Sequence, residues 1–199
     1  MPKSLKPVIA SQLRESSRVL AATARLAPRI AEAAELLLSA YRRGHKVLVF
    51  GNGGSAADAQ HFAGELVGRF TRNRPPLPAL ALTVNASDLT AIANDFGFAE
   101  VFARQLTAHA RPGDAAVAIS TSGDSPNVLR AVAAARKLGV ATVGLTGARG
   151  GRLKDAVEVC IRVPSSAVAR IQEAHGAIIH LWCGIIEDAI FKHPGGPCR

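Results

Sequence analysis

Short apolar runs alternate with helical stretches from Gly44 onward, and this alternation limits the folds that the chain can adopt. The runs VLVF, AVAIS and ATVGL contain almost no polar residue, which is typical of strands buried on both faces of a parallel sheet. Helices must then cover both faces of that sheet. The pattern predicts an α/β fold with a doubly wound parallel sheet, in which ligands bind beyond the carboxyl ends of the strands.

The individual elements are predicted from hydrophobic periodicity and from turn residues. The stretch from Leu5 to about Arg43 is expected to be helical, with Pro28 starting a second helix or kinking a long one. Strands are expected at Lys46–Phe50, Ala79–Val84, Ala115–Ile119, Ala141–Leu145 and Val157–Val163. Helices are expected at Ser55–Arg69, Ala86–Asn94, Glu100–Ala110, Ser125–Leu138 and Ala167–Phe191.

Charge and cysteine content narrow the class of protein. The formal net charge is +9, but the 24 lysine and arginine residues are spread along the chain. This distribution favours attraction of small anions such as sugar phosphates over a nucleic-acid site. The three cysteines, Cys160, Cys183 and Cys198, match neither a disulfide framework nor a zinc motif. With no apolar run of about 18 to 20 residues and no signal peptide, we expect a cytoplasmic protein without a membrane segment.

The first candidate binding loop is Gly51-Asn52-Gly53-Gly54-Ser55, between an expected strand and an expected helix. Glycines allow backbone N–H groups to approach an anion, and a helix N-terminus favours negative charge. The spacing is neither GxGxxG nor that of a P-loop, so no nucleotide fingerprint is present. Taken alone, the motif is explained equally well as a tight turn from strand to helix.

A second loop, Ser120–Ser125, carries four hydroxyl groups where an expected strand gives way to a helix. Ser125 is expected to be the N-cap, with Pro126 at the first helical position. Capping requires only one hydroxyl, so the others and the free N–H groups of the helix are available to phosphate oxygens. The loop therefore predicts a phosphate site that needs no lysine. Its hydroxyls belong to Ser120, Thr121, Ser122 and Ser125.

Two helices carry side chains suited to proton transfer or metal binding. His61 and Glu65 are four residues apart and share one helix face. Gln172 and His180 project from one broad side of the last helix. An imidazole beside a carboxylate can bind a metal or transfer protons. From spacing alone, however, His180 is more simply interpreted as a packed or solvated residue. The same interpretation applies to His109, His175 and His193.

Four segments resemble the phosphoheptose isomerase branch of the sugar-isomerase (SIS) domain family: VFGNGGSAADAQHFAGELVGRF, LTAIANDFGF, AISTSGDSPNVLRAV and RIQEAHGAIIH. The resemblance extends to about residue 191. It implies a five-stranded parallel sheet flanked by helices, and a homotetramer with active sites at subunit interfaces. It also implies conversion of D-sedoheptulose 7-phosphate into D-glycero-D-manno-heptose 7-phosphate. The chain then divides into an N-terminal helical segment on the domain and in the oligomer interface (1–43), the isomerase domain (44–192) and a flexible tail (193–199).

The resemblance further implies roles for individual residues. Contacts to the sugar are expected from Asn52, Gly53, Gly54, Asn94 and Asp95. Contacts to the phosphate are expected from Ser120, Thr121, Ser122 and Ser125. One Zn²⁺ per subunit would be bound by His61, Glu65, Gln172 and His180, with Glu65 and Gln172 also contacting substrate. Some members have an acidic residue where this chain has Ala169, so the role of that carboxylate does not carry over.

Two mechanisms are open for this reaction, which moves a proton between C1 and C2 through a cis-enediol. Glu65 can act as the base and His180 as the acid. Alternatively, a zinc ion can polarise the carbonyl group and stabilise the enediolate. The two mechanisms compete, because a residue bound tightly to a metal is a poorer base.

Two other functions are weighed against the isomerase. The same family includes a non-enzymatic protein that associates with the bacterial replication initiator and shares the RIQE segment and the stretch at Arg74–Leu82. That relative lacks the matching glutamate and late histidine, whereas Glu65 and His180 are both present here. A sugar-phosphate sensor is the third function, and the lack of any DNA-binding domain in 199 residues argues against it.

Overall fold

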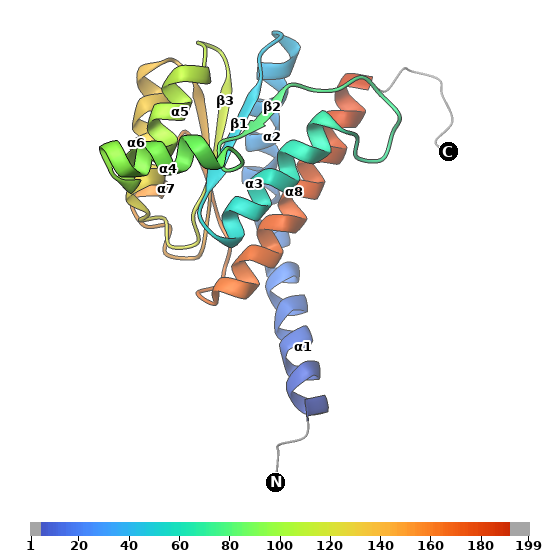
Figure 1. The fold of residues 1–199 in the computed structure, drawn as a ribbon. Coiled ribbons are helices and arrows are strands. Elements are labelled where there is room, and N and C mark those ends of the chain that lie inside the picture. Colours follow the sequence, from blue (N-terminus) through green and yellow to red (C-terminus); the bar gives the residue numbers. More distant parts are fainter. Residues whose placement is uncertain (1–4, 192–199) are drawn as a thin grey trace.

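Five parallel strands form one sheet in the order β2-β1-β3-β4-β5 in the computed structural model, which describes residues 5–191 (Figure 1). This order reverses direction between β1 and β3, so the sheet is doubly wound as predicted. The strands are β1 (Val47–Gly51), β2 (Ala79–Ala81), β3 (Ala115–Ile119), β4 (Ala141–Thr146) and β5 (Val159–Arg162). The carboxyl ends of β1 and β3 therefore mark the point where a ligand is expected.

Helices cover both faces of the sheet (Figure 1). One face is covered by α2 (Ala27–Arg42), α3 (Gly54–Val67) and α8 (Val168–Phe191). The other is covered by α4 (Ala86–Phe96), α5 (Val101–His109), α6 (Pro126–Lys137) and the short α7 (Leu153–Ala156). The predicted two-sided burial of the strands is confirmed, because Val47 and Val49 enter the first core while Leu48 and Phe50 enter the second.

The N-terminal segment consists of two helices, as Pro28 predicted. Helix α1 (Leu5–Thr23) is separated from α2 by a 3₁₀ turn, and Pro28 is the second residue of α2. Figure 1 shows α1 extending away from the sheet along the lower end of α8. Helix α1 is joined to α8 by Arg170, which donates a 2.7 Å hydrogen bond to the Gln12 carbonyl.

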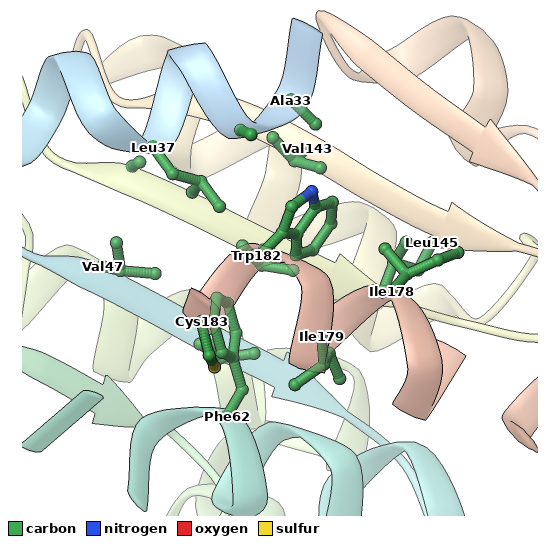
Figure 2. Packing of buried hydrophobic residues seen from close by; sticks show 14 of the residues in the cluster. Ala33, Leu37, Val47, Phe62, Val143, Leu145, Ile178, Ile179, Trp182 and Cys183 are labelled. Atoms are coloured by element: carbon green, nitrogen blue, oxygen red, sulfur yellow. The ribbon is translucent and has the colours of Figure 1, made fainter. Parts of the chain in front are cut away.

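Helix α8 is the central element of the larger core. Figure 2 shows Trp182 among residues of α2 and the strands, and its indole N–H donates to the Ile30 carbonyl at 3.1 Å. Among residues 5–191, α8 alone is long and apolar enough to cross a bilayer. Because Ile178, Ile179 and Trp182 are fully buried against the sheet, a core position accounts for this composition.

The sequence-based boundaries differ from the structure mainly at the sheet edges. The strand expected at Ala79–Val84 ends at Ala81, and the one expected at Val157–Val163 covers only Val159–Arg162. Both are edge strands with a single neighbour, so pairing rather than composition limits their length. The α7 helix was not predicted, since its four residues are too few to produce a periodic signal. Cys198, His193 and the expected tail lie outside the described residues.

Candidate active site

The turn after β1 places Asn52, Gly53 and Gly54 at the carboxyl edge of the sheet. Gly53 has a φ of +57°, a left-handed backbone conformation that favours glycine. At Gly54, the first residue of α3, a Cβ atom would overlap the side-chain amide of Gln172. Glycine at 54 therefore lets Gln172 of α8 lie directly on the start of α3. The turn and the last helix, far apart in sequence, form one surface.

Asn52 of this turn is bound to Asn127, a residue that the sequence analysis did not identify. The Asn52 amide donates to Asn127 Oδ1 at 2.9 Å, and the Asn127 amide donates back to Asn52 Oδ1 at 2.8 Å. Asn127 is buried in the first turn of α6, where its Oδ1 also accepts from the Val128 N–H. This pair joins the loop after β1 to the loop after β3 at the switch point of the sheet.

Three of the four hydroxyl groups of the Ser120–Ser125 loop, those of Ser120, Ser122 and Ser125, lie close together. Ser120 Oγ is 3.0 Å from Ser125 Oγ and 3.4 Å from Ser122 Oγ. Ser125 occupies the predicted N-cap position of α6, but its hydroxyl makes no capping hydrogen bond. The N-terminal N–H groups of α6 are therefore not satisfied by this side chain, which is directed at Ser120 instead. Hydroxyls clustered beside a helix N-terminus suit the oxygens of a phosphate group.

The loop after β4 supports the Ser120–Ser125 loop through hydrogen bonds. The Gly147 N–H donates to the Thr121 carbonyl at 3.0 Å, and the Arg152 N–H donates to Asp124 at 3.0 Å. These hydrogen bonds from Arg152 lower the pKa of the Asp124 carboxyl group. Gly123, at φ +73°, touches the Gly150 backbone so closely that any side chain there would overlap it. The Ser120–Ser125 loop is thus a supported structure rather than a free surface turn.

His61, Glu65 and His180 come together on the outer side of α3 and α8. His61 Nε2 lies 3.1 Å from Glu65 Oε1 and 3.3 Å from His180 Nε2, and the two imidazole rings meet edge to face. The same nitrogen of His61 therefore contacts both partners and lies between them. The cluster is partly open to solvent, with the His61 side chain 44% exposed.

Three other predicted site residues are not part of this cluster. Gln172 lies two turns from His180, about 12 Å along the helix axis, and contacts Gly54 instead. Asn94 and Asp95 lie near the end of α4, where the Asn94 amide donates to Asp95 Oδ1 at 2.8 Å. Both residues are exposed, and no hydrogen bond joins them to the other candidate residues within the described part of the chain.

Comparison with known proteins identifies the family. The SIS domain model matches residues 13–147. The phosphoheptose isomerase of Rhodospirillum rubrum is 56% identical over 164 residues, covering 82% of this chain and 87% of that protein. The phosphoheptose isomerase of Geobacter metallireducens is 54% identical over 185 residues, covering 92% and 98%. This chain belongs to the phosphoheptose isomerase family. The structure of the phosphoheptose isomerase from Neisseria gonorrhoeae superposes with a TM-score of 0.88 at 42% identity, covering 93% of this chain and all of that one.

The His61–Glu65–His180 cluster of this phosphoheptose isomerase family member has the donor chemistry of a catalytic zinc site. Two imidazole nitrogens and one carboxylate oxygen are common zinc ligands, and tetrahedral ligands lie about 3.3 Å apart when the bonds are about 2.0 Å. Two of the three distances in the cluster, 3.1 and 3.3 Å, match that spacing. Within residues 5–191, however, no group of three or more His, Cys, Asp or Glu side chains is arranged to hold a metal ion. The donor types suit zinc, whereas the single chain assembles neither these three side chains nor Gln172 into a metal site.

Sequence reasoning missed several residues beside the site of this family member. Asn127 could have been found as a polar residue within the first turn of a helix that follows the phosphate loop. Asp58 precedes His61 by three residues on the same face of α3, and burial raises the pKa of its carboxyl group while His61 partly opposes this shift. Phe70 stacks on the His180 ring with centroids 5.7 Å apart, and no sequence pattern indicates that contact.

Proposed function

We propose that this chain converts D-sedoheptulose 7-phosphate into D-glycero-D-manno-heptose 7-phosphate, the first step in supplying heptose for lipopolysaccharide or capsule. The observation that carries the proposal is the convergence of Glu65 and His180 on His61, beside a loop of hydroxyls at the sheet switch point. The relatives reported above, named phosphoheptose isomerases, support the same substrate. The reaction interconverts a ketose and an aldose.

In this mechanism Glu65 removes a proton from C1 of the ketose. His180 donates a proton to the oxygen on C2, which gives the cis-enediol. The O1 hydroxyl then loses its proton as C2 receives one, and the C1 carbonyl of the aldose forms. Each proton transfer by a positioned side chain is expected to contribute about 10²- to 10⁴-fold to the rate. His61 orients Glu65 by the hydrogen bond between them.

The far end of the substrate is held by the phosphate loop. The hydroxyls of Ser120, Ser122 and Ser125 and the N-terminus of α6 would bind the phosphate, while Asn52 and the glycines of its turn contact the sugar. This division places the charge far from the reacting carbons. A clamp at the distant end fixes the near carbons relative to Glu65, which is the positioning contribution to catalysis.

As the alternative to this acid–base mechanism, we propose one zinc ion per subunit at the cluster. His61, Glu65 and His180 would bind it, and Gln172 of a neighbouring subunit would act as the additional ligand. When bound, zinc supplies Lewis-acid polarisation of the carbonyl oxygen. The support is the donor set and its spacing.

A homotetramer with active sites at its interfaces is also part of the proposal. Exposed apolar side chains lie on the two helices that carry the cluster, including Val67, Leu181 and Ile185, and others line α1. Such patches are typical of surfaces covered by another protein chain. A cytoplasmic location, with a small-molecule substrate and neither nucleic acid nor membrane as partner, agrees with a sugar-phosphate enzyme.

The test is incubation of the purified protein with sedoheptulose 7-phosphate, following aldose formation. Glu65→Gln and His180→Gln should lose turnover, while the matched change Glu173→Gln, an exposed carboxylate on α8, should retain it. A wild-type protein without turnover would refute the isomerase. The replication-initiator partner is not favoured, because the relatives reported above are named as isomerases at 54 and 56% identity.

A further inference from the structure

Glu187 is a buried carboxylate that the proposed reaction does not use. It lies on α8, two turns beyond His180, and is 1% exposed. A carboxylate in such a position requires several hydrogen bonds, because burying an unpaired charge costs far more than any packing gain. The residues that donate hydrogen bonds to Glu187 therefore indicate its role.

The partners all come from one segment, residues 70–74, between α3 and β2. The backbone N–H groups of Thr71 and Arg72 donate to Oε1 at 3.0 and 2.7 Å, and that of Phe70 donates to Oε2 at 3.1 Å. The Thr71 hydroxyl donates to Oε1 at 2.7 Å, and Arg74 Nε donates to Oε2 at 3.1 Å. Because three consecutive backbone N–H groups donate to this one carboxylate, Glu187 fixes the backbone conformation of residues 70–72.

Arg74 extends this anchor to the end of α3. Its guanidinium group is 2% exposed, and it donates to the carbonyl of Leu66 at 2.7 Å and to that of Glu65 at 2.8 Å. Carbonyls in the last turn of a helix lack intrahelical partners, and here the arginine satisfies them. Glu187 is therefore linked through Arg74 to the backbone of the proposed base itself.

The same segment carries Phe70, whose ring stacks on His180. The ring centroids are 5.7 Å apart with an interplanar angle of 28°. The Phe70 ring also lies beside Gly184, one turn after His180, where a Cβ atom would be 3.6 Å from the ring. The ring thus covers one face of the imidazole, while the edge of the imidazole points at His61 Nε2 at 3.3 Å.

We propose that Glu187 and Phe70 are positioning residues for His180: Glu187 folds the 70–74 segment, and the segment holds Phe70 against the imidazole so that its edge faces His61. The inference rests on the proposed isomerase function, in which His180 contacts substrate. Neither positioning residue reaches the reacting atoms. Their contribution is orientation, and a displacement of about 1 Å in such a group can reduce the rate about 100-fold.

The experiment compares Glu187→Gln with Asp188→Asn. Asp188 is the next residue of α8, is half exposed and pairs with Arg72 of the same segment, so it provides a matched carboxylate-to-amide control. In Glu187→Gln, the side-chain NH₂ group would face backbone N–H donors and could not accept their hydrogen bonds. We expect Glu187→Gln to lower kcat about 10- to 100-fold with KM within about threefold, and Asp188→Asn to keep both values near wild type. Amide hydrogen exchange at residues 70–72 should become at least about tenfold faster only in Glu187→Gln.

A second pair of variants covers the case in which Glu187→Gln does not fold. Phe70→Leu removes the stacked ring and should lower kcat, whereas Phe70→Tyr keeps the ring and should preserve kcat. Wild-type kcat in Phe70→Leu, or in a folded Glu187→Gln with faster exchange, would overturn the inference. Unchanged exchange in Glu187→Gln would equally overturn it. Turnover by the wild-type protein is measured first, so that a failure of the isomerase function is distinguished from a failure of this inference.

Discussion

Asn52 and Asn127 exchange two hydrogen bonds between their side-chain amides, 2.9 and 2.8 Å long, across the switch point of the sheet. Each asparagine follows a different strand, so the pair fixes the turn after β1 relative to the Ser120–Ser125 loop. The amide group of each side chain donates to the amide oxygen of the other. The distance between the two candidate loops therefore depends on this contact.

The Asn52–Asn127 pair predicts strong coupling in a double-mutant cycle. Asn52→Ala and Asn127→Ala should each destabilise the fold, and the double variant should cost less than the sum, with a coupling of about 1 to 3 kcal/mol in the free energy of unfolding. Both single variants should also raise KM, since the phosphate loop loses its brace. Additive effects within about 0.3 kcal/mol would show that the pair does not act as a unit.

The phosphate loop predicts that its hydroxyls act on binding. Ser122→Ala or Ser125→Ala should weaken affinity for the sugar phosphate by about 0.5 to 1.5 kcal/mol per neutral hydrogen bond, and by more against a charged phosphate. Ser87→Ala, an exposed serine in the first turn of α4, is the matched control. Affinity measured by calorimetry that is unchanged in both folded loop variants would remove the loop from the site.

Metal removal separates the two mechanisms. If zinc is required, chelation should abolish turnover, added zinc should restore it, and His61→Ala should lose both metal and activity. If Glu65 and His180 act alone, chelated protein should remain fully active while Glu65→Gln and His180→Gln are inactive. Elemental analysis of active protein is the second measurement, and far less than one zinc per subunit would contradict the metal proposal.

The exposed apolar face of α1 predicts an assembly near four times the chain mass of 20.7 kDa. Leu5, Ile9 and Leu13 are 57 to 73% exposed in the single chain, which favours burial in an interface. Leu13→Glu should lower the mass measured by light scattering and reduce turnover with it. A wild-type monomer at micromolar concentration would refute both the tetramer and the shared active site.

His175 predicts a specific loss of stability in acid. The imidazole is fully buried and its Nε2 lies 3.2 Å from the Thr146 carbonyl. Burial lowers its pKa from 6.5 to about 4, so below pH 6.5 the unfolded chain takes up a proton that the folded chain excludes. The free energy of unfolding should therefore fall by about 3 kcal/mol between pH 7 and 4. Urea unfolding of His175→Gln should lack this component, and an identical pH dependence in the two proteins would contradict the assignment.

The order of the elements could be predicted from local pattern. Apolar runs such as VLVF and AVAIS are buried on both faces, and Pro28 marks the start of the second helix, because burial and backbone constraints act on short segments. The positions of the two candidate binding loops could also be predicted, because the carboxyl ends of parallel strands share one edge of the sheet. The edge strands were predicted too long, because pairing with a neighbour is a property of the sheet.

The sequence alone determined which residue types were available for chemistry: a glutamate and a histidine on one face of α3, hydroxyls before α6 and a histidine in the middle of α8. Only the tertiary structure decided which of them meet. It joined His180 to His61 across α3 and α8, placed Gln172 on Gly54 two turns away, and folded the 70–74 segment around Glu187. The physical reason is that periodicity specifies the face of a helix, whereas the register between two packed helices is set by side chains far apart in the chain.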